Sequence, residues 1–256
     1  MNRWEGRVAL VTGASYGIGA AICRQLVEQG MTVVGAARSY NKVQALADEL
    51  KGQKGSLTAI QCDISKDEDI RAMFSTIKQK FGGVDVCINN AGLDSNSALM
   101  DGDPSKWRAM LDVNVIGLSH CTREALVSMK ERNVDDGQIL HISSVAGHLV
   151  VAPYLVSAMY SASKHAVKAL TEGLRQELRQ AKSKIRVASI SPAATETGFF
   201  GAQRNLSEEA ATKKYTSMGF KCLEAKDIAD SVLHVLSAPP HVQVTDVVVW
   251  PTEQNV

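Results

Sequence analysis

Seven short runs rich in apolar and β-branched residues recur along this chain, and longer segments with helical periodicity separate them. The runs are Val8 to Val11, Thr32 to Val34, Leu57 to Ile60, Val84 to Ile88, Gln138 to Ile142, Ile185 to Ile190 and Val244 to Val249. Strands that are apolar throughout are covered on both faces, and strand–helix–strand order requires crossovers that leave successive strands parallel. The pattern predicts an α/β fold, a doubly wound parallel sheet of seven strands with helices on both faces.

No Pro- or Ser-rich linker, repeat or low-complexity tract interrupts this pattern over the 256 residues. One doubly wound sheet with its helices reaches this size, so we expect a single domain over residues 1–256. The one long irregular segment, Ala193 to Phe220, is rich in Thr, Gly and charged residues. We expect it to lie over the site as a lid.

Charge and cysteine content weigh against several classes of protein. The formal net charge of +1 comes with no basic stripe, so we expect neither nucleic acid nor anionic lipid as a partner. The five cysteines are widely spaced and lack Cys-x-x-Cys pairs, which predicts buried, reduced thiols and no metal site. The N-terminus has no apolar run long enough for a signal peptide or a membrane span, so a cytoplasmic location is expected.

The first predicted strand is followed by TGASYGIG, which opens a helical segment from Ile18 to Val27. In a nucleotide-binding turn of this kind, Gly13 would permit a sharp turn, Gly17 the approach of a pyrophosphate, and Gly19 close helix–strand packing. The helix dipole would favour the anion. Glycines also close ordinary loops, but the position between first strand and first helix favours a Rossmann-type cofactor site. The other cofactor contacts expected from this turn are Ser15, Tyr16 and Ile18.

The end of the second strand indicates which dinucleotide binds. NAD sites place a carboxylate there for the ribose 2′-hydroxyl, whereas this strand ends Gly35-Ala36-Ala37-Arg38-Ser39. Arg38 offers a forked cation suited to a 2′-phosphate, with Ser39 beside it. The segment predicts NADP(H) as cofactor, an ordinary surface arginine being the alternative.

Two further segments would contact the adenosine half. Asp63, between Cys62 and Ile64, follows the third strand and can accept a hydrogen bond from the adenine amino group, although a helix N-cap at Asp63 or Ser65 is a competing interpretation. The NNAG segment, with Asn90, Ala91 and Gly92, follows the fourth strand and would form the floor under the adenine ribose. Turn formation alone is the alternative for NNAG.

The segment YSASK places Tyr160 and Lys164 four residues apart in the helical segment Ser157 to Gln180, so both lie on one helical face. An ammonium near a phenol stabilises the phenolate, which would draw the pKa of Tyr160 towards physiological pH. Ser144, at the end of the fifth strand, could donate to a substrate oxygen that gains negative charge. Asn114, in the predicted helix Lys106 to Lys130, is a polar residue among apolar ones, and a water could link it to Lys164. Together these four are the predicted catalytic residues.

TGASYGIG, NNAG, Asn114, Ser144, YSASK and the SPA stretch after the sixth strand resemble the short-chain dehydrogenase/reductase family, in order and over the whole chain. The resemblance implies Tyr160 as acid/base, Lys164 lowering its pKa and binding the ribose, Ser144 orienting substrate, and Asn114 holding a relay water. It also implies that Thr197 touches the nicotinamide carboxamide, and that Pro192, Ala193 and Thr195 belong to the cofactor site.

Three segments, SMKERNVDDGQI, LTEGLRQELRQ and PTEQ, resemble a narrower group within the family that includes the NADP-dependent farnesol dehydrogenases. This resemblance implies a terpenoid alcohol such as farnesol, or a steroid, as substrate. The chain departs from the family where Pro-Gly is usual and Pro192-Ala193 stands here, which leaves the local turn open. It also has a longer segment between Ser144 and Tyr160, whose apolar residues should enlarge or re-line the substrate pocket.

Apolar residues in the loops expected around the pocket, Leu149 to Val156, Phe199, Phe200 and Met218, come without clustered Arg or Lys. A lipophilic alcohol or carbonyl suits them, although such loops would also pack on the core or a neighbouring subunit. The predicted activity is that of an NADP-dependent alcohol dehydrogenase or carbonyl reductase, with hydride passing between cofactor and carbonyl carbon. A catalytically silent NADPH-binding regulator is the alternative. A nucleotide-sugar epimerase or dehydratase is a third alternative, which is less favoured because that class needs a further C-terminal substrate domain.

The two long predicted helices, Lys106 to Lys130 and Ser157 to Gln180, carry apolar residues on more than one face, among them Leu118, Leu126, Ala169 and Leu178. In the resembled family such helices pair across a two-fold axis. A homodimer or homotetramer is therefore expected, with a monomer that buries both faces in its own core as the alternative.

Overall fold

The computed structural model describes residues 1–95, 97–150, 156–199 and 215–255. One seven-stranded sheet has the order β3-β2-β1-β4-β5-β6-β9, with every neighbouring pair parallel. Its strands are β1 (Val8–Thr12), β2 (Thr32–Ala37), β3 (Ser56–Gln61), β4 (Val86–Asn89), β5 (Gln138–Ile142), β6 (Arg186–Pro192) and β9 (Asp246–Val249). The predicted doubly wound parallel sheet is confirmed. The order reverses between β1 and β4, and the carboxyl ends of these strands flank the crevice in which such sheets bind ligands.

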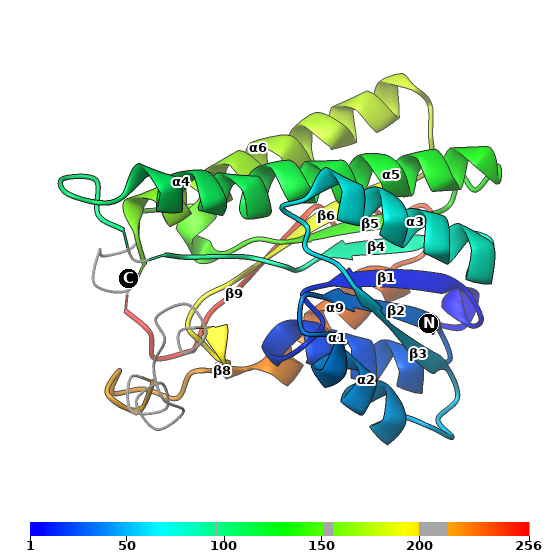
Figure 1. Ribbon diagram of the computed structural model, residues 1–256, viewed down its shortest axis with the longest axis horizontal. Coiled ribbons are helices and arrows are strands. Elements are labelled where there is room, and N and C mark those ends of the chain that lie inside the picture. Colours follow the sequence, from blue (N-terminus) through cyan, green and yellow to red (C-terminus); the bar gives the residue numbers. More distant parts are fainter. Residues whose placement is uncertain (96, 151–155, 200–214, 256) are drawn as a thin grey trace.

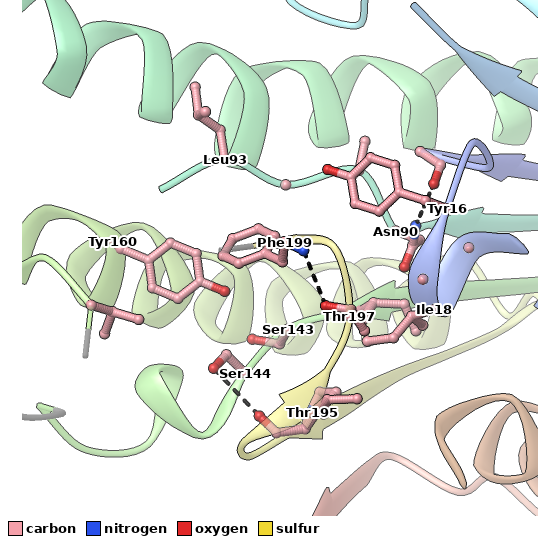
Figure 2. Close-up of a pocket in the computed structure, with 18 of the residues that line it drawn as sticks. Tyr16, Ile18, Asn90, Leu93, Ser143, Ser144, Tyr160, Thr195, Thr197 and Phe199 are labelled. Carbon is pink, nitrogen blue, oxygen red and sulfur yellow. Dashed lines mark hydrogen bonds between the residues drawn. The ribbon is translucent and has the colours of Figure 1, made fainter. Parts of the chain in front are cut away.

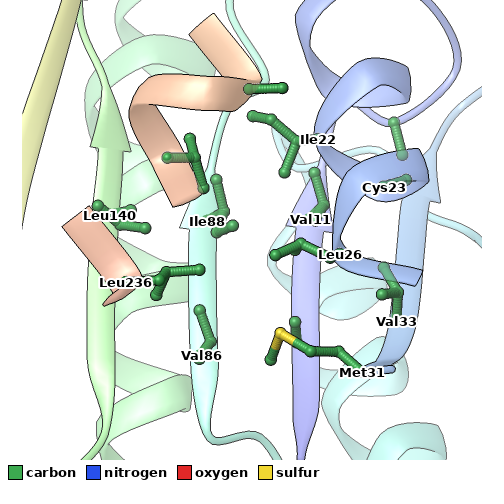
Figure 3. Packing of buried hydrophobic residues seen from close by; sticks show 14 of the residues in the cluster. Val11, Ile22, Cys23, Leu26, Met31, Val33, Val86, Ile88, Leu140 and Leu236 are labelled. Carbon is green, nitrogen blue, oxygen red and sulfur yellow. The ribbon is translucent and has the colours of Figure 1, made fainter. Parts of the chain in front are cut away.

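Helices cover both faces of the sheet (Figure 1). On one face lie α1 (Gly17–Glu28), α2 (Tyr40–Glu49) and α9 (Ala225–Ser237). On the other lie α3 (Asp67–Phe81), α4 (Pro104–Leu111), α5 (Leu118–Glu131) and α6 (Ala158–Gln180). Each face has its own apolar core. Figure 3 shows Ile22 and Leu26 of α1 and Leu236 of α9 over the side chains of β1, β4 and β5, and each such buried side chain stabilises the fold by about 1.5–3 kcal/mol.

The helix expected from Lys106 to Lys130 is not continuous. A π-helical segment, Asp112–Gly117, separates α4 from α5. Asn114 lies in this segment, and its carboxamide hydrogen-bonds both backbone groups of Leu93. Gly117 packs so closely that a Cβ there would collide with the Ile64 carbonyl oxygen. Widened helical turns of this kind are frequent at functional sites.

Part of the segment predicted to be an irregular lid is regular. Thr195–Glu196 forms a short strand, β7, which pairs in parallel with β8 (Leu223–Glu224). This ladder fixes the start of the segment beside the end of β6. Residues 200–214 of the predicted lid lie outside the described residues.

All five cysteines are buried and free of disulfides, which agrees with the expected reduced thiols. Within the described ranges, no helix has the length and apolar character needed to cross a membrane.

His141, in strand β5 of the sheet, is a buried titratable group that links α5 and α6. Its side chain in β5 is 1% exposed. Nδ1 lies 2.8 Å from the Thr171 hydroxyl of α6, and Nε2 lies 3.1 Å from the Thr122 hydroxyl of α5. Burial, reinforced by the charge of Lys164, lowers the pKa of His141 to about 4.

This lowered pKa predicts a loss of stability in acid. The unfolded chain takes up a proton on this histidine below pH ~6.5, whereas the folded chain does so only near the lowered pKa. The free energy of unfolding should therefore fall by about 2.5 kcal/mol between pH ~7 and ~4.5 from this residue alone. Urea unfolding at a series of pH values measures it. The fall should be shallower by that amount in His141→Gln than in wild type, and unchanged in His234→Gln, which alters an exposed histidine of α9. Parallel pH curves for wild type and His141→Gln would contradict the assignment.

Candidate active site

A cavity of about 720 Å³ opens at the carboxyl ends of the central strands. Its wall comes from the glycine turn before α1, the ends of β2, β3, β4 and β5, the first turns of α6 and the segment after β6. Every residue predicted for the cofactor lies on this wall: Gly13, Ser15, Tyr16, Gly17, Ile18, Gly19, Arg38, Ser39, Cys62, Asp63, Ile64, Asn90, Ala91, Gly92, Tyr160, Lys164, Pro192, Ala193, Thr195 and Thr197. Ser144 joins them, whereas Asn114 lies one layer behind, under Leu93.

The glycine turn is packed against the exit of β4. Gly13 has φ +69°, and a Cβ there would lie 2.8 Å from the Ala91 Cα, so only glycine fits without strain. A Cβ on Gly19 would collide with the Gly13 carbonyl oxygen, which agrees with the predicted close approach of helix and turn. Asn90 donates from Nδ2 to the carbonyls of Thr12 and Gly13, at 2.9 and 3.2 Å. NNAG is thus a clamp on the glycine turn as well as part of the cavity wall.

The N-terminus of α1 faces this cavity without a side-chain cap. Its N-cap residue, Tyr16, makes no side-chain hydrogen bond to the first turn. The free amide groups of a helix N-terminus attract an anion. The turn and α1 therefore present a cradle for a phosphate group, which is what a dinucleotide requires here.

The far end of the cavity carries two cations. Arg38 is exposed and follows the last residue of β2, and no described carboxylate lies within ion-pair distance of its guanidinium. Lys42, in the first turn of α2, lines the same end and was not predicted. The signal for it is a second basic residue one helical turn after Arg38. The two side chains give this end a positive potential.

Asp63 lies beside these cations and holds a local turn. Its Oδ1 accepts hydrogen bonds from the amide and hydroxyl of Ser65, at 3.0 and 2.7 Å. Burial opposes its ionisation, but these hydrogen bonds and the charge of Arg38 outweigh burial and lower the pKa of Asp63. The N-cap interpretation is wrong, because α3 begins after Lys66 and has no side-chain cap.

Tyr160 projects from the first turn of α6 into the other end of the cavity. Figure 2 shows its hydroxyl pointing towards Ser143 and Ser144, with the Phe199 ring beside it. The two rings have centroids 6.0 Å apart at an interplanar angle of 57°. Burial raises the pKa of Tyr160 well above its usual value; the charge of Asp94 adds to this, and a hydrogen bond with Ser144 opposes it.

Lys164 lies one turn further along α6, with its side chain 3% exposed. Its Nζ donates to the Ile142 carbonyl at 2.9 Å and is 5.6 Å from the centroid of the Tyr160 ring. Burial lowers the pKa of Lys164 to about 8. The sequence predicted a lowered pKa for Tyr160, whereas its pKa in the chain without cofactor is raised. Burial is the cause for Tyr160, and burial also lowers the pKa of Lys164, so that the ammonium is less able to stabilise a phenolate.

Ser144 follows β5 and caps a short 3-10 turn, Val145–Gly147. Its Oγ accepts from the Ala146 amide at 3.1 Å and donates to the Pro192 carbonyl at 3.4 Å. The hydroxyl therefore lies between the turn and the end of β6, within the cavity wall.

Asn114 connects the β4 exit to α6. Its Oδ1 accepts from the Leu93 amide at 2.7 Å, and its Nδ2 donates to the Leu93 carbonyl and the Ser163 hydroxyl at 2.8 and 3.0 Å. A Cβ on Gly92 would lie 3.7 Å from Asn114 Oδ1 and 3.8 Å from Lys164 Nζ. The amide and the ammonium therefore flank the same backbone segment.

The backbone at Pro192-Ala193, which the sequence left open, is extended. The Ala193 amide donates to the Val249 carbonyl at 2.8 Å and so continues the ladder between β6 and β9. The next amide, of Ala194, donates to Gln254 Oε1 at 3.1 Å. Gln254 also lines the cavity and was not predicted, because its contact depends on the folding back of the C-terminal segment.

Apolar side chains lie beside Tyr160 on the cavity wall, and Leu93, Ala146, Val156 and Phe199 pack in one cluster with it. Other described apolar side chains on the wall are Val113, Val145, Met218 and Phe220. Of the loop residues predicted for this wall, Phe199, Met218 and Val156 are on it, whereas residues 151–155 and Phe200 lie outside the described residues. For Leu149 and Val150 the prediction is wrong, because neither lines the cavity and Val150 is 72% exposed. Leu93 and Val113 were not predicted, because the sequence does not indicate that the segment after β4 meets the middle of the long predicted helix at this cavity.

Comparisons with known proteins agree with the predicted resemblance. The family model for short chain dehydrogenase matches residues 7–208. The chain is 56% identical over 256 residues to dehydrogenase/reductase SDR family member 11 of Gallus gallus, covering 99% of each chain. It is 46% identical over 257 residues to farnesol dehydrogenase of Aedes aegypti, covering 100% of each chain. The closed form of a serine dehydrogenase complexed with NADP+ superposes with a TM-score of 0.86 at 30% identity, over 97% of this chain and 96% of that one.

The packing of the glycine turn predicts opposite effects for two glycine substitutions. Gly19→Ala forces a Cβ against the Gly13 carbonyl and should lower the free energy of unfolding by about 1–3 kcal/mol. Gly173→Ala is the matched control, because that glycine lies inside α6 with nothing within 4 Å of an added Cβ. It should raise stability by about 0.5–1 kcal/mol. Chemical denaturation measures both, and equal effects would show that the turn is not tightly packed.

Proposed function

The chain belongs to the short-chain dehydrogenase family, and we propose that it is an NADP(H)-dependent oxidoreductase that interconverts an alcohol and its aldehyde or ketone on a lipophilic substrate. The observation that carries the proposal is one cavity that joins a glycine turn and a positive end to a buried tyrosine and lysine, a partly buried serine and several apolar side chains. These are the parts that hydride transfer and proton transfer require side by side.

The residues present fit a dinucleotide. The turn at Gly13 leaves no room for a side chain, and the uncapped N-terminus of α1 would hold the pyrophosphate. Arg38 and Lys42 would bind a 2′-phosphate, and β2 ends without the carboxylate that a 2′-hydroxyl would need. When bound, the cofactor supplies hydride to the carbonyl carbon or takes it from the alcohol. The positive end of the cavity favours NADP(H) over NAD(H).

Ser144, Tyr160 and Lys164 would then have different roles toward the substrate oxygen. Ser144 would donate to that oxygen as negative charge grows on it. Tyr160 would deliver the proton, since burial keeps the phenol protonated at neutral pH. Lys164 would replenish that proton and bind the ribose, with Asn114 holding the path behind it. The apolar wall excludes water from the reacting carbon.

A terpenoid alcohol such as farnesol, or a steroid, is the proposed substrate. Leu93, Ala146, Val156 and Phe199 give the wall beside Tyr160 an apolar part, and the identity to a farnesol dehydrogenase supports the same class of substrate. An assay of purified protein with NADPH and a panel of terpenoid, steroid and quinone carbonyls tests the proposal. If no compound of this panel is reduced at the expense of NADPH, the proposed activity is contradicted.

A homodimer or homotetramer in the cytoplasm is the proposed setting. Of the apolar residues expected on free helix faces, Leu118 is buried, and Leu126 and Leu178 pack on the chain's own core, so only Ala169 is exposed. Other apolar side chains take that place: Ile116, Val127 and Leu170 are 56%, 39% and 38% exposed along the α5 and α6 region. These support pairing of this face with a second copy.

The role of Tyr160 predicts a loss of turnover on removal of one hydroxyl. Tyr160→Phe should lower kcat for carbonyl reduction at least about 10³-fold and leave the Kd for NADPH within threefold. Tyr215→Phe is the matched control, because Tyr215 lines the same cavity but donates its hydroxyl to the Thr197 carbonyl. It should change kcat less than about tenfold. Stopped-flow rates and NADPH fluorescence titration measure these quantities, and substantial turnover by Tyr160→Phe would remove the proposed role.

The positive end of the cavity predicts the cofactor preference. Replacing Ala37 with Asp and Arg38 with Leu should lower the ratio of kcat/KM for NADPH to that for NADH at least about tenfold. Lys51→Ala removes an exposed cation outside the cavity wall and should leave this ratio unchanged. The same ratio in the double variant and wild type would count against NADP(H).

A further inference from the structure

Residues 192–197 cross the cavity wall from the end of β6 to the glycine turn. At one end, the Pro192 carbonyl accepts a hydrogen bond from the Ser144 hydroxyl at 3.4 Å. At the other end, a Cβ on Gly17 would lie 3.0 Å from the Thr197 Cβ, so the segment ends against the first turn of α1 (Figure 2). Most of the segment lines the cavity. A dinucleotide with its phosphates at the glycine turn and its reacting ring near Ser144 would therefore have its nicotinamide half against this segment.

Two ladders hold the backbone of this segment, and one amide lies between them. The Ala193 amide donates to the Val249 carbonyl at 2.8 Å, where the pairing of β6 with β9 ends. The Ala194 carbonyl accepts from the Leu223 amide at 2.9 Å, where the pairing of β7 with β8 begins. The Ala194 amide belongs to neither ladder. Loss of the acceptor of a partly buried backbone amide costs free energy, so the position of this peptide depends on what the amide binds.

Gln254, in the C-terminal segment, supplies that acceptor. Its Oε1 accepts from the Ala194 amide at 3.1 Å, although the two residues are 60 positions apart in the chain. The segment that carries Gln254 is itself held in place, because the Gln254 amide donates to the Pro251 carbonyl at 3.2 Å and Pro251 is buried. The chain thus folds back after β9 and places a side chain on the one peptide between the two ladders.

The contact depends on an oxygen atom and not on the bulk of the side chain. Gln254 is half-buried and lines the cavity, whereas Thr252 and Glu253 before it are exposed and lie outside the cavity wall. An aliphatic side chain at position 254 would occupy similar space and leave the Ala194 amide without this acceptor. A glutamate there would keep an oxygen at the same distance along the side chain.

We propose that Gln254 is a positioning residue for the nicotinamide half of the cofactor, which it serves by fixing the Ala194 peptide beneath the ring. This inference rests on the proposed function and deepens it. The adenosine half should not depend on the contact, because Arg38 and Lys42 lie at the other end of the cavity. Hydride transfer should depend on it, because the rate falls steeply when the reacting groups are displaced.

Two ligands separate this local role from a general loss of structure. NADPH carries both halves of the cofactor, whereas adenosine 2′,5′-bisphosphate carries the adenosine half alone. Isothermal titration calorimetry gives the Kd of each for wild type, for Gln254→Met and Gln254→Leu, which lack the oxygen, and for Gln254→Glu, which keeps one. Glu253→Ala is the matched control, since it removes the exposed side chain next to Gln254. Amide hydrogen exchange at Ala194, measured by NMR, reports on the contact without any ligand.

Gln254→Met and Gln254→Leu should each raise the Kd for NADPH about tenfold and leave the Kd for adenosine 2′,5′-bisphosphate within twofold of wild type. Their kcat for carbonyl reduction should fall about tenfold, and the Ala194 amide should exchange faster. Gln254→Glu should keep the Kd for NADPH within threefold of wild type, and Glu253→Ala should match wild type. Either aliphatic variant suffices if the other does not fold.

Unchanged NADPH affinity in the aliphatic variants would overturn the proposal, whatever the exchange rate at Ala194. An equal loss of affinity for the two ligands, or a Gln254→Glu variant no better than Gln254→Met, would overturn it as well. A wild-type chain that binds NADPH but reduces no carbonyl would instead refute the proposed function, and the two affinities would still test the role of Gln254.

Discussion

The burial of the Lys164 ammonium at the end of β5 is the constraint on which the rest of the site depends. A charge that is 3% exposed needs a fixed acceptor, and the Ile142 carbonyl supplies one at 2.9 Å. This contact anchors α6 across the carboxyl edge of the sheet, and Tyr160, one turn earlier, is carried to the same depth. The same burial lowers the pKa of Lys164 to about 8 and raises that of Tyr160. Without cofactor, Tyr160 is therefore a proton donor and Lys164 a group that can return the proton to it. A bound oxidised nicotinamide, which is cationic, would instead favour the phenolate form of Tyr160.

The short segment after β4 joins the two halves of the site. Asn90 hydrogen-bonds the glycine turn, and Leu93 hydrogen-bonds Asn114 of the π-helical segment. Asp94 accepts a hydrogen bond from Ser157, the N-cap residue of α6. The part of the wall suited to a nucleotide and the part suited to proton transfer are thus held through the same few residues. Loss of any of these three contacts should displace wall residues at both ends of the cavity, because the segment that joins them is short and held at both sides.

The sequence was sufficient for what depends on local pattern. Buried parallel strands are apolar on both faces, so their number and parallel direction followed from the alternation of strands and helices, and the glycine turn followed from its place between β1 and α1. What depends on contacts between distant segments could not be predicted. The π-helical segment at Asn114 requires pairing with Leu93, 21 residues earlier in the chain, and the short β7–β8 ladder requires the end of β6 to meet Leu223. The spacing of Tyr160 and Lys164 placed them on one face, but the direction of the pKa shift depended on burial and on Asp94, which spacing does not encode.

In the proposed reaction, this cavity brings a nicotinamide ring against a carbonyl carbon beside Tyr160. The most direct measurement follows deuterium from NADPH labelled at C4, on each face in turn, into the product formed from a terpenoid or steroid carbonyl. We expect the alcohol to carry the deuterium on its carbinol carbon for one of the two labelled cofactors. An alcohol without label from either, or bound NADPH that never passes its hydride to any carbonyl, would contradict it.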